Sequence, residues 1–321
     1  MDKKFYYNEI TLIKIFATFF ITWFHFKGIV PETFAPLFVG GGIGNSLFFY
    51  ASGYLLSFKQ EDYYGQWVIK KFVRILPSIW VFTMVVLMFA PYAIDFKWYN
   101  LIYPTRFWFV NCILCFFFVI YLLRNKINSL KGILVVSAIN CILYVANYFL
   151  FVDYSKVVLD EGGVKCWFYF FLFFLWGYYD KKTKSVCKGS WKSMICFFIA
   201  IVCFFFYKKV CCKYELFTSA QFIFIPLFFG GVVYFSRYLA NFLASFQIPE
   251  KGKKVLSKIS DLTLDIYIVQ IVIINLIGEK LPFPISIISL MFLILISAKV
   301  NNYLSDKIRM ALNYLLTCRR N

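Results

Sequence analysis

The sequence predicts an all-α polytopic membrane protein of about ten transmembrane helices, with both termini in the cytoplasm. Hydrophobic residues make up 61% of the 321 residues, including 42 Phe and 23 Tyr, a share well above that of ordinary soluble domains. Long apolar runs recur along the chain, and about 20 apolar residues are needed for an α-helix to cross the hydrocarbon core. In addition, the segments between the runs are alternately rich and poor in Lys and Arg.

Ten apolar runs are long enough to be considered as spans. The sixth and seventh are the shortest and give the weakest prediction. In chain order, the runs lie at residues 9–27, 40–58, 75–94, 106–123, 132–151, 166–179, 193–207, 218–236, 259–278 and 285–300.

The distribution of basic residues predicts the orientation, because cytoplasmic loops hold the excess of Lys and Arg. With the N-terminus inside, the inner segments hold 24 of the 34 basic residues and the outer loops hold nine, Lys14 being the remaining one. The inner loops are too short for a core of their own. We therefore expect a single membrane-embedded domain over residues 1–321, without a soluble domain and with the first span retained.

The net charge of +18 is explained by cytoplasmic loops that face anionic lipid headgroups. Membrane lipids are therefore expected partners, and nucleic acid is not. Most of the ten cysteines lie within the predicted spans, where a thiol packs as a small hydrophobe, and no metal site is expected. Cys211 and Cys212 fall in a predicted outer loop, and the sequence leaves open whether they are oxidised.

The first span carries a lysine and the only histidine of the chain. Lys14 and His25 are eleven residues apart, so at about 100° per residue they share one helix face, about 16 Å apart along the axis. Ionisable side chains within a span are costly and often functional. For each alone, a structural explanation exists: Lys14 could reach the headgroups, and His25 could serve only in helix packing.

This motif, K14 IFATFFITWF H25, resembles the signature of the acyltransferase-3 family of multi-pass membrane acyltransferases, which includes bacterial O-acetylases of lipopolysaccharide and capsule. The family usually has Arg where this chain has Lys14, so a planar bidentate donor is replaced by a point charge. The resemblance implies that His25 and Lys14 are catalytic. His25 is our candidate for the general base, because its unperturbed pKa is near neutrality.

The next segment, GGGIGNSLFFYASGYLLS at residues 40–57, is similar to the second span of this family. Ser52 and Gly53 form a small patch that favours close helix packing. We assign Asn45 and Ser52 to the substrate channel or its support.

The segment KKFVRILPSIW at residues 70–80 resembles the basic stretch before the third span of the family. The resemblance implies that Lys70, Lys71 and Arg74 face the cytosol and bind the phosphates of acyl-CoA. The same charges could instead serve only to set the topology. Pro77 is expected in the first turns of the span, where proline is tolerated.

Two further segments are similar to the family. RFWFVNCIL at 106–114 retains Trp108 of an aromatic entry to the fourth span, with Arg106 where His is common. SDLTLDIYIVQ at 260–270 has Gln270 in place of a usual His and Asp265 in place of a small residue. We assign Trp108, Asp265, Tyr267 and Gln270 to the channel or its support, and Asp265 is a possible partner of Lys14.

The resemblance implies an O-acyltransferase of the bacterial cytoplasmic membrane, with no permanently bound cofactor. The donor would be cytosolic acyl-CoA, commonly acetyl-CoA, and the acceptor a hydroxyl of an envelope polysaccharide or glycolipid. The sequence leaves open the acyl group, the acceptor sugar, the oligomeric state, and the choice between direct transfer and an acyl-enzyme.

Two other functional classes remain possible from the sequence. Ten spans with intramembrane Lys, His and Asp could form the pathway of an exporter or flippase of an envelope substrate. The chain could also be a membrane subunit that scaffolds other envelope enzymes. Consumption of acyl-CoA distinguishes the enzyme from the exporter, and tolerance of His25→Ala distinguishes the scaffold from both.

Overall fold

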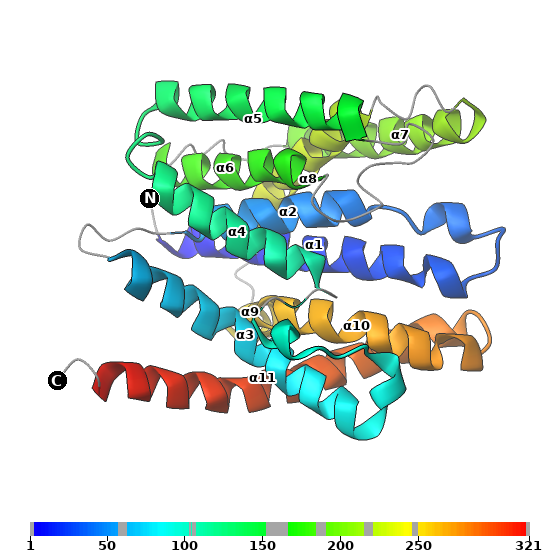
Figure 1. Cartoon of the computed structure of the whole chain (residues 1–321). Coiled ribbons are helices and arrows are strands. Elements are labelled where there is room, and N and C mark those ends of the chain that lie inside the picture. The colour runs from blue at the N-terminus through cyan, green and yellow to red at the C-terminus, as the bar shows by residue number, and fades with distance from the viewer. Residues whose placement is uncertain are drawn as a thin grey trace. The chain divides into compact units, whose positions relative to one another are not determined.

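The computed structural model describes residues 3–56, 63–102, 104, 107–151, 166–183, 191–214, 221–245 and 250–318. Within these ranges the ordered elements are helices, and the all-α prediction is confirmed (Figure 1). The α-helices are α1 (Lys3–His25), α2 (Gly41–Tyr54), α3 (Tyr64–Phe89), α4 (Trp108–Leu123), α5 (Leu130–Phe151), α6 (Trp167–Thr183), α7 (Trp191–Lys213), α8 (Gln221–Ser245), α9 (Glu250–Asp261), α10 (Thr263–Ile277) and α11 (Ile285–Cys318). Short 3₁₀ helices are η1 (Phe26–Ile29), η2 (Ala35–Leu37), η3 (Pro91–Ala93), η4 (Trp98–Leu101) and η7 (Gly278–Lys280).

Several of these helices are long and apolar enough to cross a membrane. Among the described residues, four meet both criteria, and α9 with α10 forms a fifth candidate that is broken between Asp261 and Thr263. The four are Glu9–Ile29, Tyr64–Phe89, Leu130–Asn147 and Ile285–Leu316. The chain is thus a membrane protein with helical spans. The count of ten spans and the cytoplasmic position of both termini stay predictions.

Two helices extend well beyond the predicted runs. Helix α3 begins at Tyr64, so the basic stretch 70–74 is helical, and Pro77 lies in the helix interior. The prediction that the basic stretch precedes the helix and that Pro77 lies in its first turns was therefore wrong. Helix α11 continues to Cys318, far past the predicted end at 300. Good helix formers occur in both added parts: Gln, Lys and Arg in that of α3, and Leu, Lys and Arg in that of α11.

The boundaries also differ in the second half of the chain. Helix α7 continues through Lys213, so Cys211 and Cys212 belong to a helix and not to a loop; their side chains lie outside the described residues. Helix α8 continues to Ser245, which places Arg237 inside a helix although the sequence predicted it in a cytoplasmic loop. The polar, amphipathic helix α9 was not predicted at all, because hydropathy alone does not detect it.

The chain forms two compact units, which are described separately. Unit 1 consists of residues 1–21, 40–56 and 124–260, and unit 2 of residues 22–39, 57–123 and 261–321. In unit 1, α2 packs against α6, α5 against α6, and α7 against α8. In unit 2, α11 packs against both α3 and α10, and α3 packs against α4.

Glycines allow α2 and α6 to approach closely. A Cβ atom added to Gly53 would lie 2.0 Å from the carbonyl oxygen of Phe174, and one added to Gly177 would lie 2.0 Å from that of Tyr50. Two glycines facing each other's helix backbones are typical of tightly packed membrane helices. The predicted packing role of the small residues near Ser52 is confirmed for Gly53.

A buried ionic cluster joins four helices of unit 1. Arg237 of α8 is 6% exposed, and its Nε donates a 2.5 Å hydrogen bond to Glu9 of α1. Its Nη2 donates to Asp180 of α6 and, at 3.3 Å, to the hydroxyl of Tyr50 of α2. The Tyr50 hydroxyl in turn donates to Asp180. Such buried charges are stable only when paired and hydrogen-bonded, and the pairing here connects α1, α2, α6 and α8.

Candidate functional site

The C-terminal end of α1 carries His25 and belongs to unit 2. His25 is half-buried, is the last residue of α1, and contacts the ring of Phe24 edge-on at 5.6 Å between centroids. One turn earlier, the hydroxyl of Thr22 donates a 2.6 Å hydrogen bond to Oε1 of Gln270. This bond connects the last turns of α1, close to His25, to the middle of α10.

The side-chain amide of Gln270 is hydrogen-bonded through its oxygen but not through its nitrogen among the described residues. The side chain is 1% exposed, and Thr22 occupies its carbonyl oxygen. Its Nε2 has no hydrogen-bond partner among the described residues. A buried amide without a partner is destabilising, so such a group needs an explanation, and a catalytic role is one of them. The unpartnered Nε2 belongs to Gln270, the residue that stands where the acyltransferase-3 family usually has histidine.

Aromatic residues pack around the same helix. Tyr267, one turn before Gln270 on α10, is buried against Phe109 with 5.2 Å between ring centroids. Phe107 lies 6.5 Å from the same ring. Trp108 is half-buried at the first position of α4, whereas Arg106 lies outside the described residues. Tyr267 therefore packs α10 against the entry to α4.

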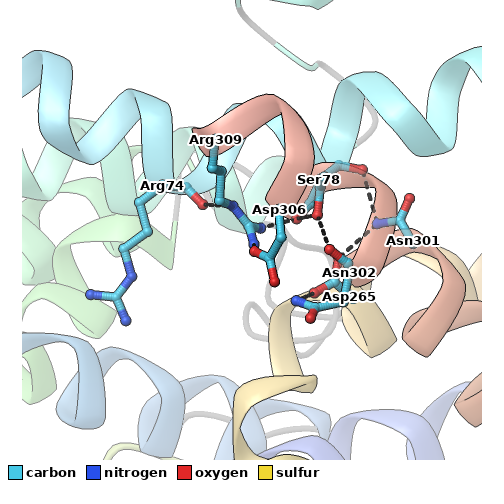
Figure 2. A network of polar contacts seen from close by, with 8 residues as sticks. Arg74, Ser78, Asp265, Asn301, Asn302, Asp306 and Arg309 are labelled. Atoms are coloured by element: carbon cyan, nitrogen blue, oxygen red, sulfur yellow. Dashed lines mark hydrogen bonds and ion pairs between the residues drawn. The ribbon is translucent and has the colours of Figure 1, made fainter. Parts of the chain in front are cut away.

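A polar network connects α3, α10 and α11 (Figure 2). Asp265 of α10 is 1% exposed and accepts hydrogen bonds from Asn301 at 2.7 Å and Asn302 at 2.9 Å. The Ser78 hydroxyl is also hydrogen-bonded to Asp265. Asn301 donates a further bond, 3.0 Å long, to the Ser78 carbonyl. A buried carboxylate with several neutral donors is well satisfied without a cation, and this one holds the three helices together.

Arg309 extends the network to the basic stretch of α3. Its Nη2 donates to the Ser78 hydroxyl, its Nη1 pairs with Asp306, and its Nε donates at 3.2 Å to the carbonyl of Arg74. Figure 2 shows the Arg74 side chain extending away from these contacts. The guanidinium of Arg309 thus supports the helix turn that presents Arg74.

The three basic residues of α3 do not form one group. Lys70 and Arg74 are exposed and lie four residues apart, on one helix face. Lys71 is instead half-buried, with its Nζ 5.1 Å from the ring centre of Trp67 and 5.3 Å from that of Phe117. Cation–π contacts of this kind hold the lysine against the protein. Lys70 and Arg74 therefore form the more accessible pair.

The residues that the sequence singled out fall into both units. Unit 2 contains His25, Lys70, Lys71, Arg74, Trp108, Asp265, Tyr267 and Gln270, whereas unit 1 contains Lys14, Asn45 and Ser52. Helix α1 includes both Lys14 and His25. Lys14 and Ser52 are half-buried, and Asn45 is buried. The suggested pairing of Lys14 with Asp265 stays a prediction, since the described partners of Asp265 all belong to unit 2.

The sequence did not predict the residues that hydrogen-bond to the candidate site residues. These are Thr22, Ser78, Asn301, Asn302 and Arg309. The Asn301–Asn302 pair directly follows an apolar run, and it was the one visible signal. Thr22 and Ser78 look like many other hydroxyl residues of membrane helices, which usually bond only to their own helix.

No group of three or more His, Cys, Asp or Glu side chains that could hold a metal ion is found in the described part of the chain. Residues 7–299 match the acyltransferase domain model of the acyltransferase-3 family. No curated protein and no solved structure matches the chain.

Proposed function

The chain belongs to the acyltransferase-3 family of membrane acyltransferases, and we propose that it transfers an acyl group, commonly acetyl, from cytosolic acyl-CoA to a hydroxyl group. The proposed acceptor is a polysaccharide or glycolipid of the bacterial cell envelope. The proposed location is the cytoplasmic membrane, with both termini inside. The family match over residues 7–299 is the observation that carries this proposal.

We assign the role of general base to His25. It is the only imidazole of the chain, it lies in the motif that the family shares, and no hydrogen bond of its ring is found among the described residues. Thr22, one turn away, is bonded to Gln270, so polar groups are present on two helices near this end of α1. An acyl transfer needs both a base for the acceptor and donors for the developing oxyanion.

The proposed reaction proceeds through a tetrahedral oxyanion. His25 takes the proton of the acceptor hydroxyl while the oxygen attacks the thioester carbonyl, and the carbonyl electrons move to oxygen. The resulting oxyanion accepts a hydrogen bond from Nε2 of Gln270, whose orientation Thr22 fixes. The carbonyl then re-forms as the C–S bond breaks, and the CoA thiolate takes the proton from the His25 imidazolium. An ester and CoA leave the enzyme.

The basic residues of α3 supply the proposed donor site. Lys70 and Arg74 are exposed on one face of the helix, and Arg309 supports the turn that carries Arg74. Phosphate groups form strong charge-assisted hydrogen bonds with such side chains. We assign Lys70, Lys71 and Arg74 to the nucleotide of acyl-CoA, with Lys71 in a secondary role because it packs against Trp67. Lys14 is proposed as a second catalytic residue beside His25, and it would act as a cation.

The test uses the purified chain in nanodiscs with acetyl-CoA labelled in the acetyl group and a panel of envelope glycans. We expect label to enter a glycan in an alkali-labile ester bond while free CoA appears in equal amount. Lys70→Ala with Arg74→Ala should raise KM for acetyl-CoA. If no acyl-CoA of any chain length is consumed with any acceptor, while the glycan crosses the bilayer of sealed vesicles, the chain is an exporter and the proposal is wrong.

A further inference from the structure

Unit 1 contains a cavity of about 780 Å³ that the proposed acyl transfer does not use. It is bounded by α5, α6 and α8, with Tyr50 of α2 at one side. Its volume is within the range of sites that bind small molecules. Apart from Tyr50, which lies in the segment 40–57, its lining residues do not belong to the family motifs discussed above.

The residues that line the cavity extend along α6 from Tyr169 to Asp180. Asp180 and Arg237 line one end, and Tyr169 lines a region eleven residues earlier on α6, about 16 Å away along the helix axis. Leu134, Leu172 and Phe173 are among the predominantly apolar residues between them. The cavity thus has ionic groups at Asp180 and Arg237, an apolar middle and a neutral phenol at Tyr169, an arrangement that suits a hydrocarbon chain with one charged end.

A glycine keeps this space open. Gly230 of α8 lines the cavity, and a Cβ atom added there would meet no atom within 4 Å. At the neighbouring Gly231, close packing explains the glycine, since an added Cβ would lie 3.1 Å from the Cβ of Ala200. Glycine weakens the interior of a helix, so a glycine that faces empty space has no structural benefit. A large side chain at position 230 would occupy part of the cavity.

Polar groups at both ends remain available to a ligand. Arg237 uses Nε and Nη2 for Glu9, Asp180 and Tyr50, and its Nη1 has no partner among the described residues. The hydroxyl of Tyr169 also has no hydrogen-bond partner among the described residues, although this residue is only 3% exposed. A guanidinium edge favours phosphate or ester oxygens as acceptors.

We propose that this cavity binds a membrane phospholipid, with one acyl chain along the apolar wall and its phosphate or ester oxygens at Nη1 of Arg237. A span-forming unit lies among phospholipids, and an apolar cavity of this size is filled by the apolar molecules at hand, because protein interiors are closely packed. The lipid site is distinct from the acyl transfer proposed at His25, since the two share no residue.

Native mass spectrometry of the delipidated protein with added phosphatidylglycerol tests the site. Gly230→Leu and Ser137→Leu each fill the cavity, from α8 and from α5 respectively. Leu227→Phe is the matched control, because it adds bulk to α8 at a side chain that is 56% exposed and outside the cavity lining. Thermal unfolding of each variant shows whether it is folded.

We expect wild type and Leu227→Phe to retain one phosphatidylglycerol more than either cavity variant. The same lipid should raise Tm only in wild type and the control, and diacylglycerol, which lacks the phosphate, should bind more weakly. Equal lipid counts in all four proteins would overturn the proposal. The proposal would also be wrong if the cavity variants still bound phosphatidylglycerol but no longer bound palmitoyl-CoA. In that case the cavity would hold the acyl tail of the donor.

Discussion

At the scale of single residues, the proposed chemistry depends on His25 of α1 and on Gln270 of α10, which Thr22 orients. His25 is the only histidine, and Gln270 replaces a histidine in a segment similar to the family, so both attract attention without a structure. Thr22 became visible only through its bond to Gln270. That bond depends on how α10 packs against the end of α1, and hydropathy does not encode such packing.

The amide of Gln270 should contribute directly to catalysis. We expect Gln270→Leu to lower kcat about 100-fold with little change in KM, because loss of one oxyanion donor costs about this much. Free CoA release under saturating acetyl-CoA measures it. Gln270→His, which restores the usual family residue, should retain activity.

A comparison with Thr22→Val separates donation from orientation. This variant removes the hydroxyl that fixes the Gln270 carbonyl but leaves Nε2 in place. We expect a drop in kcat of about tenfold, smaller than for Gln270→Leu, since one neutral hydrogen bond contributes about 1 kcal/mol. If Gln270→Leu has the same kcat as wild type, the amide is only a packing group.

At the scale of elements, Asp265 should be a main determinant of stability in unit 2. Asp265→Ala leaves the amides of Asn301 and Asn302 without their acceptor. We expect a loss of about 3 kcal/mol or more in the free energy of unfolding, since each hydrogen bond to a charged group contributes about 1.5–3 kcal/mol. Thermal unfolding in detergent checks it.

Asp306→Ala is the matched control for Asp265→Ala. Asp306 also belongs to the network, but its side chain is 55% exposed. Exposed ion pairs contribute about 0–1 kcal/mol, so its Tm should stay close to that of wild type. Equal destabilisation by both variants would mean that the buried carboxylate has no special role.

The contact between α2 and α6 should tolerate no side chain at Gly53. Gly53→Ala places a methyl group where the carbonyl oxygen of Phe174 lies, and overpacking of this kind costs about 1–3 kcal/mol. Gly65→Ala on α3 meets no atom within 4 Å and should leave Tm unchanged or slightly higher. If Gly53→Ala unfolds at the wild-type temperature, α2 and α6 are not in tight contact.

The sequence predicted the elements better than their ends. Apolar runs identify the cores of α1, α4, α5 and α10, since burial in lipid requires helices there. They do not indicate that α3 begins at Tyr64 or that α11 continues to Cys318. Past the hydrocarbon core, helix continuation depends on propensity and on packing against neighbours, and Arg237 shows that a charge need not end a helix inside the bundle.

At the scale of the whole molecule, the basic residues predict an orientation that can be measured. With 24 of 34 Lys and Arg in the predicted inner segments, the positive-inside rule places both termini in the cytoplasm. A green fluorescent protein fused after Asn321 should therefore fluoresce, whereas alkaline phosphatase fused there should be inactive. The reverse result would place the C-terminus outside and contradict the predicted orientation.

The most direct test of the proposed chemistry is the rate of CoA release from acetyl-CoA by wild type and His25→Ala, with acceptor present. A general base contributes about 10²–10⁴-fold to a rate. We therefore predict that His25→Ala releases CoA at least about 100-fold more slowly, while it unfolds at the wild-type temperature and still binds CoA. Release at the wild-type rate by a folded His25→Ala would contradict the assignment of His25 as the base.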